Sequence, residues 1–173
     1  FLYVSDKVHI RPLIYGGGQQ KGMRSGTINV PGIAGLGVAA AEAYAHLAEN
    51  AEHMYELKAY FADKLQQIGD VTINGKAGHD SAPQIISASF LGVRSEVLLH
   101  SLEDRCIYVS AGSACSSNHP SQSGTLLNIG LDHAHQESTL RFSFCPETTR
   151  EELDYTYGVL EELLPMLRRY TRH

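Results

Sequence analysis

The sequence predicts a mixed α/β fold, in the form of an α+β sandwich in which strands and helices pack as two layers. Short runs rich in β-forming residues alternate along the chain with longer segments of strong helix formers. Hydrophobic residues make up 43% of the chain and charged residues 19%, which provides a core and argues against disorder. A length of 173 residues suits one domain, or one small domain joined to a piece of another.

The first 32 residues are expected to be extended and then irregular. β-Forming residues predict a strand at Phe1–Val4 and a weaker one at Val8–Ile10. Five glycines then occur in the thirteen positions from Tyr15 to Thr27, and regular structure there would carry a large entropic cost. This stretch is therefore either an ordered functional loop or a flexible linker.

Residues 33–68 are expected to be connecting helices. Pro31 is well placed in a first helical turn, and the segments 39–45 and 48–65 are dense in Ala, Glu, Leu and Lys. Apolar residues recur at spacings of three, four and seven: Leu47, Met54, Leu57, Phe61 and Leu65. The pattern predicts two helices, or one bent helix, ending at Gly69.

Residues 69–173 are expected to form a separate small domain of short strands and helices. Strands are predicted at Val71–Ile73, Gln84–Phe90, Ile107–Val109 and Thr139–Phe144. Helices are predicted from Ser95 to about Asp104, over Gly124–Ile129, and from a Thr149/Glu152 capping box to about Arg168. The buried face of the first of these helices is expected to hold Val97, Leu98, Leu99 and Leu102.

Composition excludes several classes of function. A net charge of −5 gives no basic footprint for nucleic acid, and no run approaches the roughly 18 apolar residues of a membrane span. Three cysteines form no disulfide framework and no metal-ligand spacing, so we expect a reducing, cytoplasmic compartment. The chain begins not with Met but with Phe1–Val4, which reads as the interior of a strand, so we expect a fragment of a longer polypeptide.

Cys115 is the candidate nucleophile. It follows a short predicted strand and lies among small polar residues, in Ser110-Ala111-Gly112-Ser113-Ala114-Cys115-Ser116-Ser117. Such neighbours leave a thiol open to approach, as a reactive cysteine requires, although a merely exposed surface cysteine has the same surroundings. Cys106 and Cys145 lie in apolar contexts and are expected to be small core residues.

Two further segments could bind anions. Arg24, Ser25, Gly26 and Thr27 offer charge, hydroxyls and close backbone approach to a phosphate, although the segment is neither a Walker loop nor a Rossmann fingerprint and could be a flexible connection. Arg141 is expected on the opposite strand face from Leu140 and Phe142, where it could grip a carboxylate or simply be solvated. Histidines fall in loop-like segments at His79, His119, His133 and His135, and their spacing does not favour a metal site.

Taken in order, three segments resemble the cysteine desulfurases of iron–sulfur cluster and thiolated-cofactor assembly. They are GGGQQKGMRSGT (Gly16–Thr27) followed by Val30-Pro31-Gly32, then Ser110–Ser117, then Leu140-Arg141-Phe142-Ser143. The resemblance covers essentially the whole chain. It implies the class-V aminotransferase branch of the fold type I enzymes that use pyridoxal 5′-phosphate (PLP), working as homodimers.

The resemblance also implies an assignment of parts. Residues 1–32 would be the edge of the large, PLP-binding domain, and residues 69–173 the C-terminal small domain. Arg141 would pair with the carboxylate of L-cysteine, and Cys115 would take its sulfur as a persulfide, releasing L-alanine and passing the sulfur to an acceptor or scaffold protein. Thr27 would meet the PLP phosphate of the neighbouring subunit.

One family residue is missing. The lysines of this chain are Lys7, Lys21, Lys58, Lys64 and Lys76, and none follows the Ser-Gly-His segment that carries the Schiff-base lysine of the family. We therefore expect the chain alone to be inactive. Two other interpretations remain open: a selenocysteine lyase-like enzyme of the same fold, and a cofactor-free sulfur-carrier or interaction module.

Overall fold

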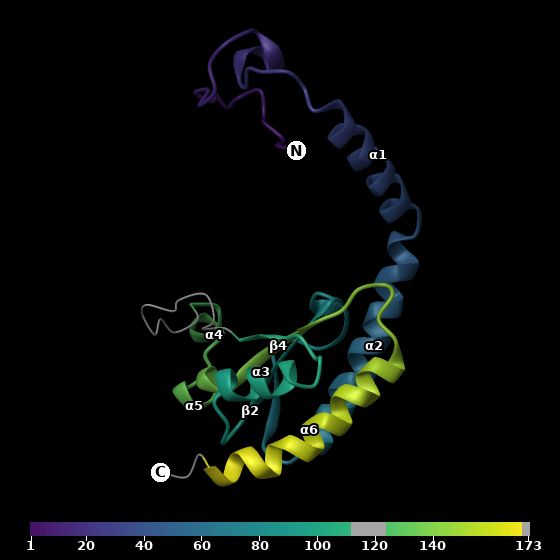
Figure 1. Cartoon of the computed structure of the whole chain (residues 1–173), viewed down its shortest axis with the longest axis vertical. Coiled ribbons are helices and arrows are strands. Elements are labelled where there is room, and N and C mark those ends of the chain that lie inside the picture. Colours follow the sequence, from purple (N-terminus) through teal and green to yellow (C-terminus); the bar gives the residue numbers. More distant parts are fainter. Residues whose placement is uncertain (112–123, 171–173) are drawn as a thin grey trace. The chain divides into compact units, whose positions relative to one another are not determined.

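The computed structural model describes residues 1–111 and 124–170, and these form two compact units, Phe1–His46 and Leu47–His173 (Figure 1). The first unit contains a 3₁₀ turn, η1 (Gln19–Gly22), and a helix, α1 (Val30–Ala45). Asn29 caps α1, since its Oδ1 accepts a hydrogen bond from the Gly32 N–H at 3.1 Å. As expected, Pro31 lies in the first helical turn.

The strands predicted at Phe1–Val4 and Val8–Ile10 are wrong. Both segments are irregular, and the side chains of Phe1, Leu2 and Tyr3 are exposed. A strand needs a neighbour for its backbone N–H and C=O groups, and the described part of this unit offers none. β-Propensity without a pairing partner therefore did not produce a strand.

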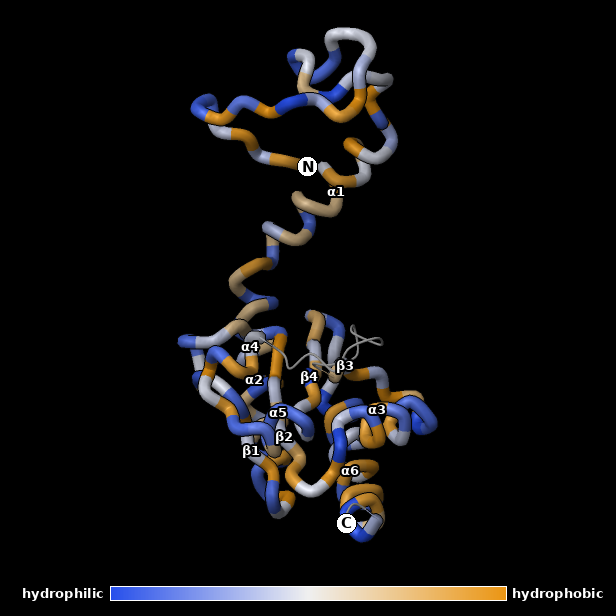
Figure 2. The backbone as a smooth tube through the Cα atoms, turned by 90° about the vertical axis from the view of Figure 1, so that its left-hand side faces the viewer, coloured by the Kyte–Doolittle hydropathy of each residue, from blue (hydrophilic) through white to orange (hydrophobic). Residues whose placement is uncertain are grey.

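The second unit is built on a four-stranded antiparallel sheet in the order β1-β2-β4-β3 (Figure 2). The strands are β1 (Val71–Asn74), β2 (Ile85–Phe90), β3 (Ser110–Ala111) and β4 (Thr139–Ser143). The other elements are α2 (Leu47–Gln67), η2 (Gly78–Asp80), α3 (Ser95–Glu103), α4 (Gly124–Asn128), α5 (His133–Glu137) and α6 (Arg150–Tyr170).

Aromatic rings join the sheet to α2 in the core of this unit. Phe61 of α2 is fully buried and meets Phe142 edge-to-face, with ring centroids 5.3 Å apart, and Phe144 at 6.3 Å. Phe90 of β2 meets the same Phe142 at 6.1 Å. Leucines of α3 and α6 complete the cluster, which includes Leu98, Leu102, Leu160 and Leu164. The result is a mixed α/β fold.

Most elements of this unit lie where the sequence predicts them. Of the two predicted connecting helices, the second is α2, which begins at Leu47. The capping box of α6 is confirmed, because Thr149 N–H donates to Glu152 Oε2 at 2.9 Å and Glu152 N–H to Thr149 Oγ1 at 3.3 Å. The predicted strand at Ile107–Val109 is displaced, since the paired residues are Ser110 and Ala111.

Three predictions of burial or structure are wrong in this unit. Val97 is 47% exposed, because the inward face of α3 is taken by Leu98, Leu99 and Leu102. Cys106 and Cys145 are both exposed rather than in the core. Cys106 lies in the turn after α3 with φ of 58°, and Cys145 lies two positions after the end of β4, where its N–H donates to Thr148 Oγ1 at 3.0 Å.

Candidate active site on the polar face of the sheet

Arg141 lies on the face of the sheet opposite the aromatic core. Along β4, Leu140 and Phe142 are buried while Arg141 and Ser143 are exposed, which confirms the predicted alternation. A side chain one position from Phe142 cannot reach the core without breaking the strand. The strand period therefore holds the guanidinium on the polar face.

Serines flank Arg141 on both neighbouring strands. In the strand register Arg141 is opposite Ser87 of β2 and Ser110 of β3. The Arg141 guanidinium donates through Nη2 to Ser110 Oγ at 3.3 Å. Because serine is small, neither of these two neighbours covers the guanidinium, and Arg141 is exposed. Nothing in the sequence pattern singled out Ser87 or Ser110, although each lies in a predicted strand or motif.

The positive charge of Arg141 has no carboxylate partner among the residues that the structure describes. Arg105, in contrast, forms a two-pronged ion pair with Glu162, with Nη2–Oε1 and Nη1–Oε2 distances of 2.6 and 3.2 Å. Arg168 donates to the backbone carbonyls of Leu91 and Asp70. Among the described residues, the side-chain partner of Arg141 is the neutral Ser110 hydroxyl, so the exposed guanidinium keeps its capacity to bind an anion.

A hydrogen-bonded network lies beside Arg141 and stiffens this face. Asn74 Nδ2 donates to Ser89 Oγ at 2.9 Å, and the buried hydroxyls of Ser89 and Thr139 are 2.7 Å apart. Thr139 Oγ1 also donates to the His135 carbonyl at 2.6 Å, which ties α5 to the sheet. Three strands and one helix are thus joined next to the guanidinium.

Cys115, the predicted nucleophile, lies outside the described residues. The described chain before it ends at Ala111, which pairs with Leu140 beside Arg141, and resumes at Gly124. Cys115 comes four positions after Ala111 in the sequence.

The glycine-rich segment of the first unit is held together by its own polar groups. Ser25 is buried, and its hydroxyl donates to the Gly17 carbonyl at 2.6 Å. Gly26 N–H donates to Gln19 Oε1 at 3.2 Å, and Arg24 Nη1 to the Ser25 carbonyl at 3.1 Å. Thr27 is exposed, two positions before the cap of α1. Three of the four predicted phosphate-binding residues therefore already have partners, and Thr27 presents its side chain outward.

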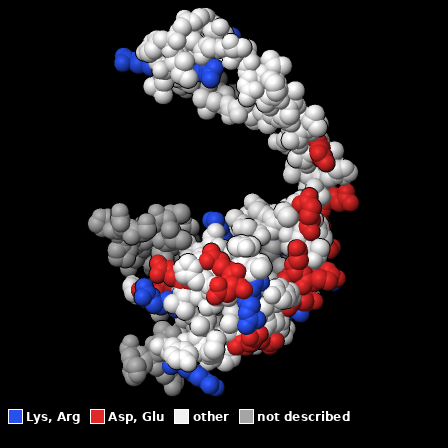
Figure 3. All heavy atoms as spheres, viewed as in Figure 1, with Lys and Arg blue, Asp and Glu red and all other residues white. Residues whose placement is uncertain are grey.

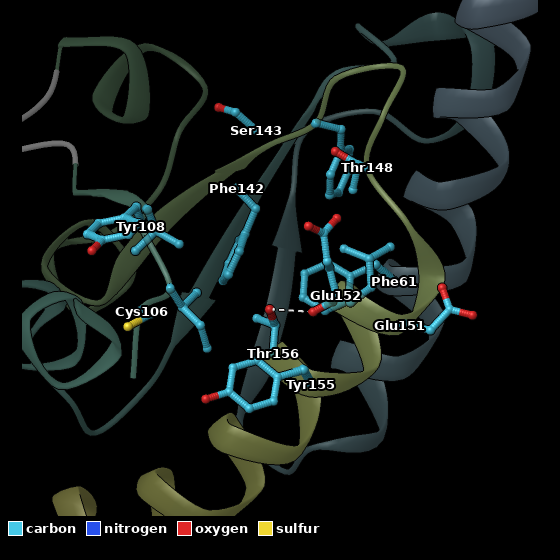
Figure 4. Close-up of a pocket in the computed structure, with 14 residues that line it drawn as sticks. Phe61, Cys106, Tyr108, Phe142, Ser143, Thr148, Glu151, Glu152, Tyr155 and Thr156 are labelled. Carbon is cyan, nitrogen blue, oxygen red and sulfur yellow. Dashed lines mark hydrogen bonds between the residues drawn. The ribbon is translucent and has the colours of Figure 1, made fainter. Parts of the chain in front are cut away.

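A cavity of about 490 Å³ opens on the other face of the sheet (Figure 4). Phe142 points into it, with Tyr108 and Tyr155 around it, while Ser143 points away. Since Arg141 and Phe142 are consecutive residues of one strand, the cavity and the guanidinium belong to opposite faces. The cavity is therefore distinct from the candidate site.

No metal centre emerges from the described residues. His133 and His135 lie in α5 rather than in a loop or strand, and His135 Nδ1 contacts Asp132 Oδ1 at 2.8 Å. No group of three or more potential metal ligands occurs in the part of the chain that the structure describes.

Figure 3 shows acidic side chains gathered on α2 and α6. Among the described helices, none is long and apolar enough to cross a membrane.

Comparison with known proteins decides the family. The family model described as aminotransferase class-V matches residues 1–156. This chain belongs to the class-V aminotransferase family. The match covers the glycine-rich segment, Cys115 and Arg141 together.

Relatives of this class-V aminotransferase chain are named as cysteine desulfurases. It is 38% identical over 170 residues to the cysteine desulfurase IscS of Dictyoglomus turgidum, covering 96% of this chain and 42% of the relative. The identity to the IscS of Rickettsia bellii is 37% over 170 residues, covering 96% of this chain and 41% of the relative. The chain thus spans about two fifths of the length of the relatives it matches.

Solved structures place the fold of this class-V aminotransferase chain among NifS-like proteins. A structure titled NifS-like protein matches 95% of the chain and 42% of its own length, with a TM-score of 0.80 and 36% identity. The NifS-like protein from Rickettsia africae matches 90% of the chain and 40% of its own length, with a TM-score of 0.76 and 27% identity. The fold is therefore a part of the NifS-like, fold type I architecture.

Proposed function

We propose that this chain is the part of a cysteine desulfurase that grips the substrate carboxylate and accepts its sulfur. The observation that carries the proposal is the exposed Arg141 guanidinium, which has no carboxylate partner among the described residues and lies beside the strand that leads to Cys115. In this proposal residues 69–173 are the C-terminal small domain, and residues 1–32 are the edge of the large domain.

Arg141 would bind the carboxylate of L-cysteine. A guanidinium presents two parallel N–H groups that match the two oxygens of a carboxylate. The sheet supports this role, because β4 is paired on both sides and the Ser89–Thr139 network lies on the same face. A rigid support keeps the guanidinium in place while the substrate reacts.

Cys115 would take the sulfur. Its thiolate attacks the substrate sulfur, so that an S–S bond forms while the Cβ–S bond of the substrate breaks. The electron pair of the broken bond stays with the carbon skeleton, which gains a proton and leaves as L-alanine. The chain is left with a persulfide on Cys115, and splitting the transfer into two steps lowers each barrier. The sulfur then passes to an acceptor or scaffold protein for iron–sulfur cluster or thiolated-cofactor assembly.

The residues of this chain would form only part of a PLP-binding site. Thr27 is exposed and follows the glycine-rich segment, whose polar groups hydrogen-bond to one another. An exposed hydroxyl at this position suits a contact with the phosphate of PLP bound by the other subunit of a homodimer. No lysine of the chain has the required sequence context, and two of the five serve other contacts: Lys58 donates to Ser81 Oγ and Lys64 pairs with Asp154. When bound, PLP supplies an electron sink for the chemistry at the substrate. The anchoring lysine would have to come from residues outside this sequence.

The test uses the longest polypeptide encoded in frame with this chain, incubated with L-cysteine and PLP. We expect L-alanine to form and mass spectrometry to find one added sulfur on the peptide that contains Cys115. Cys115→Ser should abolish both, whereas Cys145→Ser, which alters another exposed cysteine, should retain both. Labelling of Cys145 instead of Cys115 would refute the assignment.

Arg141→Ala should raise the KM for L-cysteine about 10- to 100-fold, because hydrogen bonds to a charged group contribute about 1.5–3 kcal/mol. An unchanged KM would remove Arg141 from the site. Selenocysteine, offered as a second substrate, separates the two enzyme interpretations. The 173-residue chain alone should release no alanine, and alanine release from it would contradict the need for an external lysine.

A further inference from the structure

We propose that Ser110 is a positioning residue for Arg141. Its hydroxyl accepts a hydrogen bond from Arg141 Nη2 at 3.3 Å and so holds the guanidinium beside β3. The inference rests on the proposed function, because that function assigns the carboxylate of L-cysteine to Arg141. It adds a residue that lies 31 positions away in the sequence.

The strand pairing explains why Ser110 can act on Arg141. The two residues are opposite one another in the β3–β4 register, so the backbone sets the distance between their Cα atoms. Arginine has a long side chain with many rotamers, and an exposed one on a strand explores most of them. Among the described residues, Ser110 supplies the one side-chain acceptor for this guanidinium, so it selects among those rotamers.

The chemistry of serine suits the task better than a carboxylate would. Glu162 binds Arg105 through two hydrogen bonds, at 2.6 and 3.2 Å, so an acidic partner takes up two guanidinium nitrogens. A neutral hydroxyl orients one nitrogen and leaves the positive charge available. Arg141 therefore keeps donors and charge for a substrate.

This reasoning predicts an order for three substitutions at position 110. Ser110→Thr keeps a hydroxyl and strand propensity, so it should leave carboxylate binding near wild type. Ser110→Ala removes one hydrogen bond and should weaken carboxylate binding about two- to tenfold. Ser110→Asp places a competing carboxylate beside the guanidinium and should weaken carboxylate binding as much as Arg141→Ala. Ser143→Ala, on the same face but without a bond to Arg141, is the matched control.

The first experiment measures KM and kcat for L-cysteine with the longest in-frame polypeptide. We expect Ser110→Ala to raise KM about two- to tenfold with kcat within twofold of wild type, and to have no further effect in the Arg141→Ala background. A loss confined to kcat, or equal effects of Ser110→Ala and Ser143→Ala, would overturn the positioning role. If Arg141→Ala itself leaves KM unchanged, it is the proposed function that fails.

The second experiment needs no catalysis. The 173-residue chain, labelled with ¹⁵N-arginine, is titrated with acetate while the Arg141 Nε–Hε signal is followed by NMR; the signal is assigned by its loss in Arg141→Lys. Acetate should shift the wild-type signal, about two- to tenfold more acetate should be needed in Ser110→Ala, and Ser110→Asp should not respond. Identical titrations of wild type and Ser110→Ala would refute the inference.

Discussion

Thr139→Val tests whether buried hydroxyls hold the strand that carries Arg141. Thr139 is 3% exposed and precedes Arg141 by two positions on β4. Its hydroxyl lies 2.7 Å from Ser89 Oγ, 3.3 Å from Asn74 Nδ2 and 2.6 Å from the His135 carbonyl. Valine has nearly the same shape, so the substitution removes these polar contacts without opening a large cavity.

The expected cost is about 1–3 kcal/mol of the free energy of unfolding. That range corresponds to the loss of two hydrogen bonds made by the Thr139 hydroxyl, at about 0.5–1.5 kcal/mol each. Ser89, which is fully buried, keeps Asn74 as its partner. Replacing Ser89 by Ala removes the same Ser89–Thr139 hydrogen bond, so in the double variant that bond is lost only once. The double variant should therefore cost less than the sum of the single variants, by about 1 kcal/mol.

The assay is urea unfolding of the 173-residue chain, followed by circular dichroism. Thr72→Val is the control, because Thr72 lies opposite Ser89 on the same face but is exposed, and it should change stability by less than about 0.5 kcal/mol. The reasoning is refuted if Thr139→Val costs no more than Thr72→Val. Strict additivity with Ser89→Ala would show that the two hydroxyls are not coupled.

Two further predictions concern the helices that cover the sheet. Phe61→Ala should lower the free energy of unfolding by about 3–5 kcal/mol, because it removes a fully buried ring that packs against Phe142 and Phe144. A decrease of less than about 1 kcal/mol in urea unfolding would contradict this prediction. Asp154→Asn should flatten the acid dependence of stability. Hydrogen bonds from Lys64 and then Tyr60 hold the pKa of Asp154 below its ordinary 3.8, so its contribution is complete above that value and disappears as pH falls through the lower folded-state pKa. The difference between wild type and variant in urea midpoint should shrink between pH 5 and acid pH, and a constant difference would contradict the assignment.

Local pattern was sufficient for the helices and central strands of the second unit. Periodicity marked α2, the capping box marked α6, and alternation placed Arg141 on the opposite strand face from Leu140 and Phe142. These features depend on neighbours a few residues apart, so the sequence carries them directly. The resemblance to cysteine desulfurases also rested on the sequence alone, and the family match confirms the class-V aminotransferase family.

Other features depend on residues far apart in the chain. Phe1–Val4 has the composition of a strand, yet the described first unit supplies no partner strand for it. Cys106 and Cys145 looked like core residues, but a turn and a strand end expose them. The neighbour of Arg141 is Ser110, and only the pairing of β3 with β4 brings the two together. Sequence patterns report which face a side chain takes within its own element, whereas the contact between two elements is decided by packing and register, which no local pattern encodes.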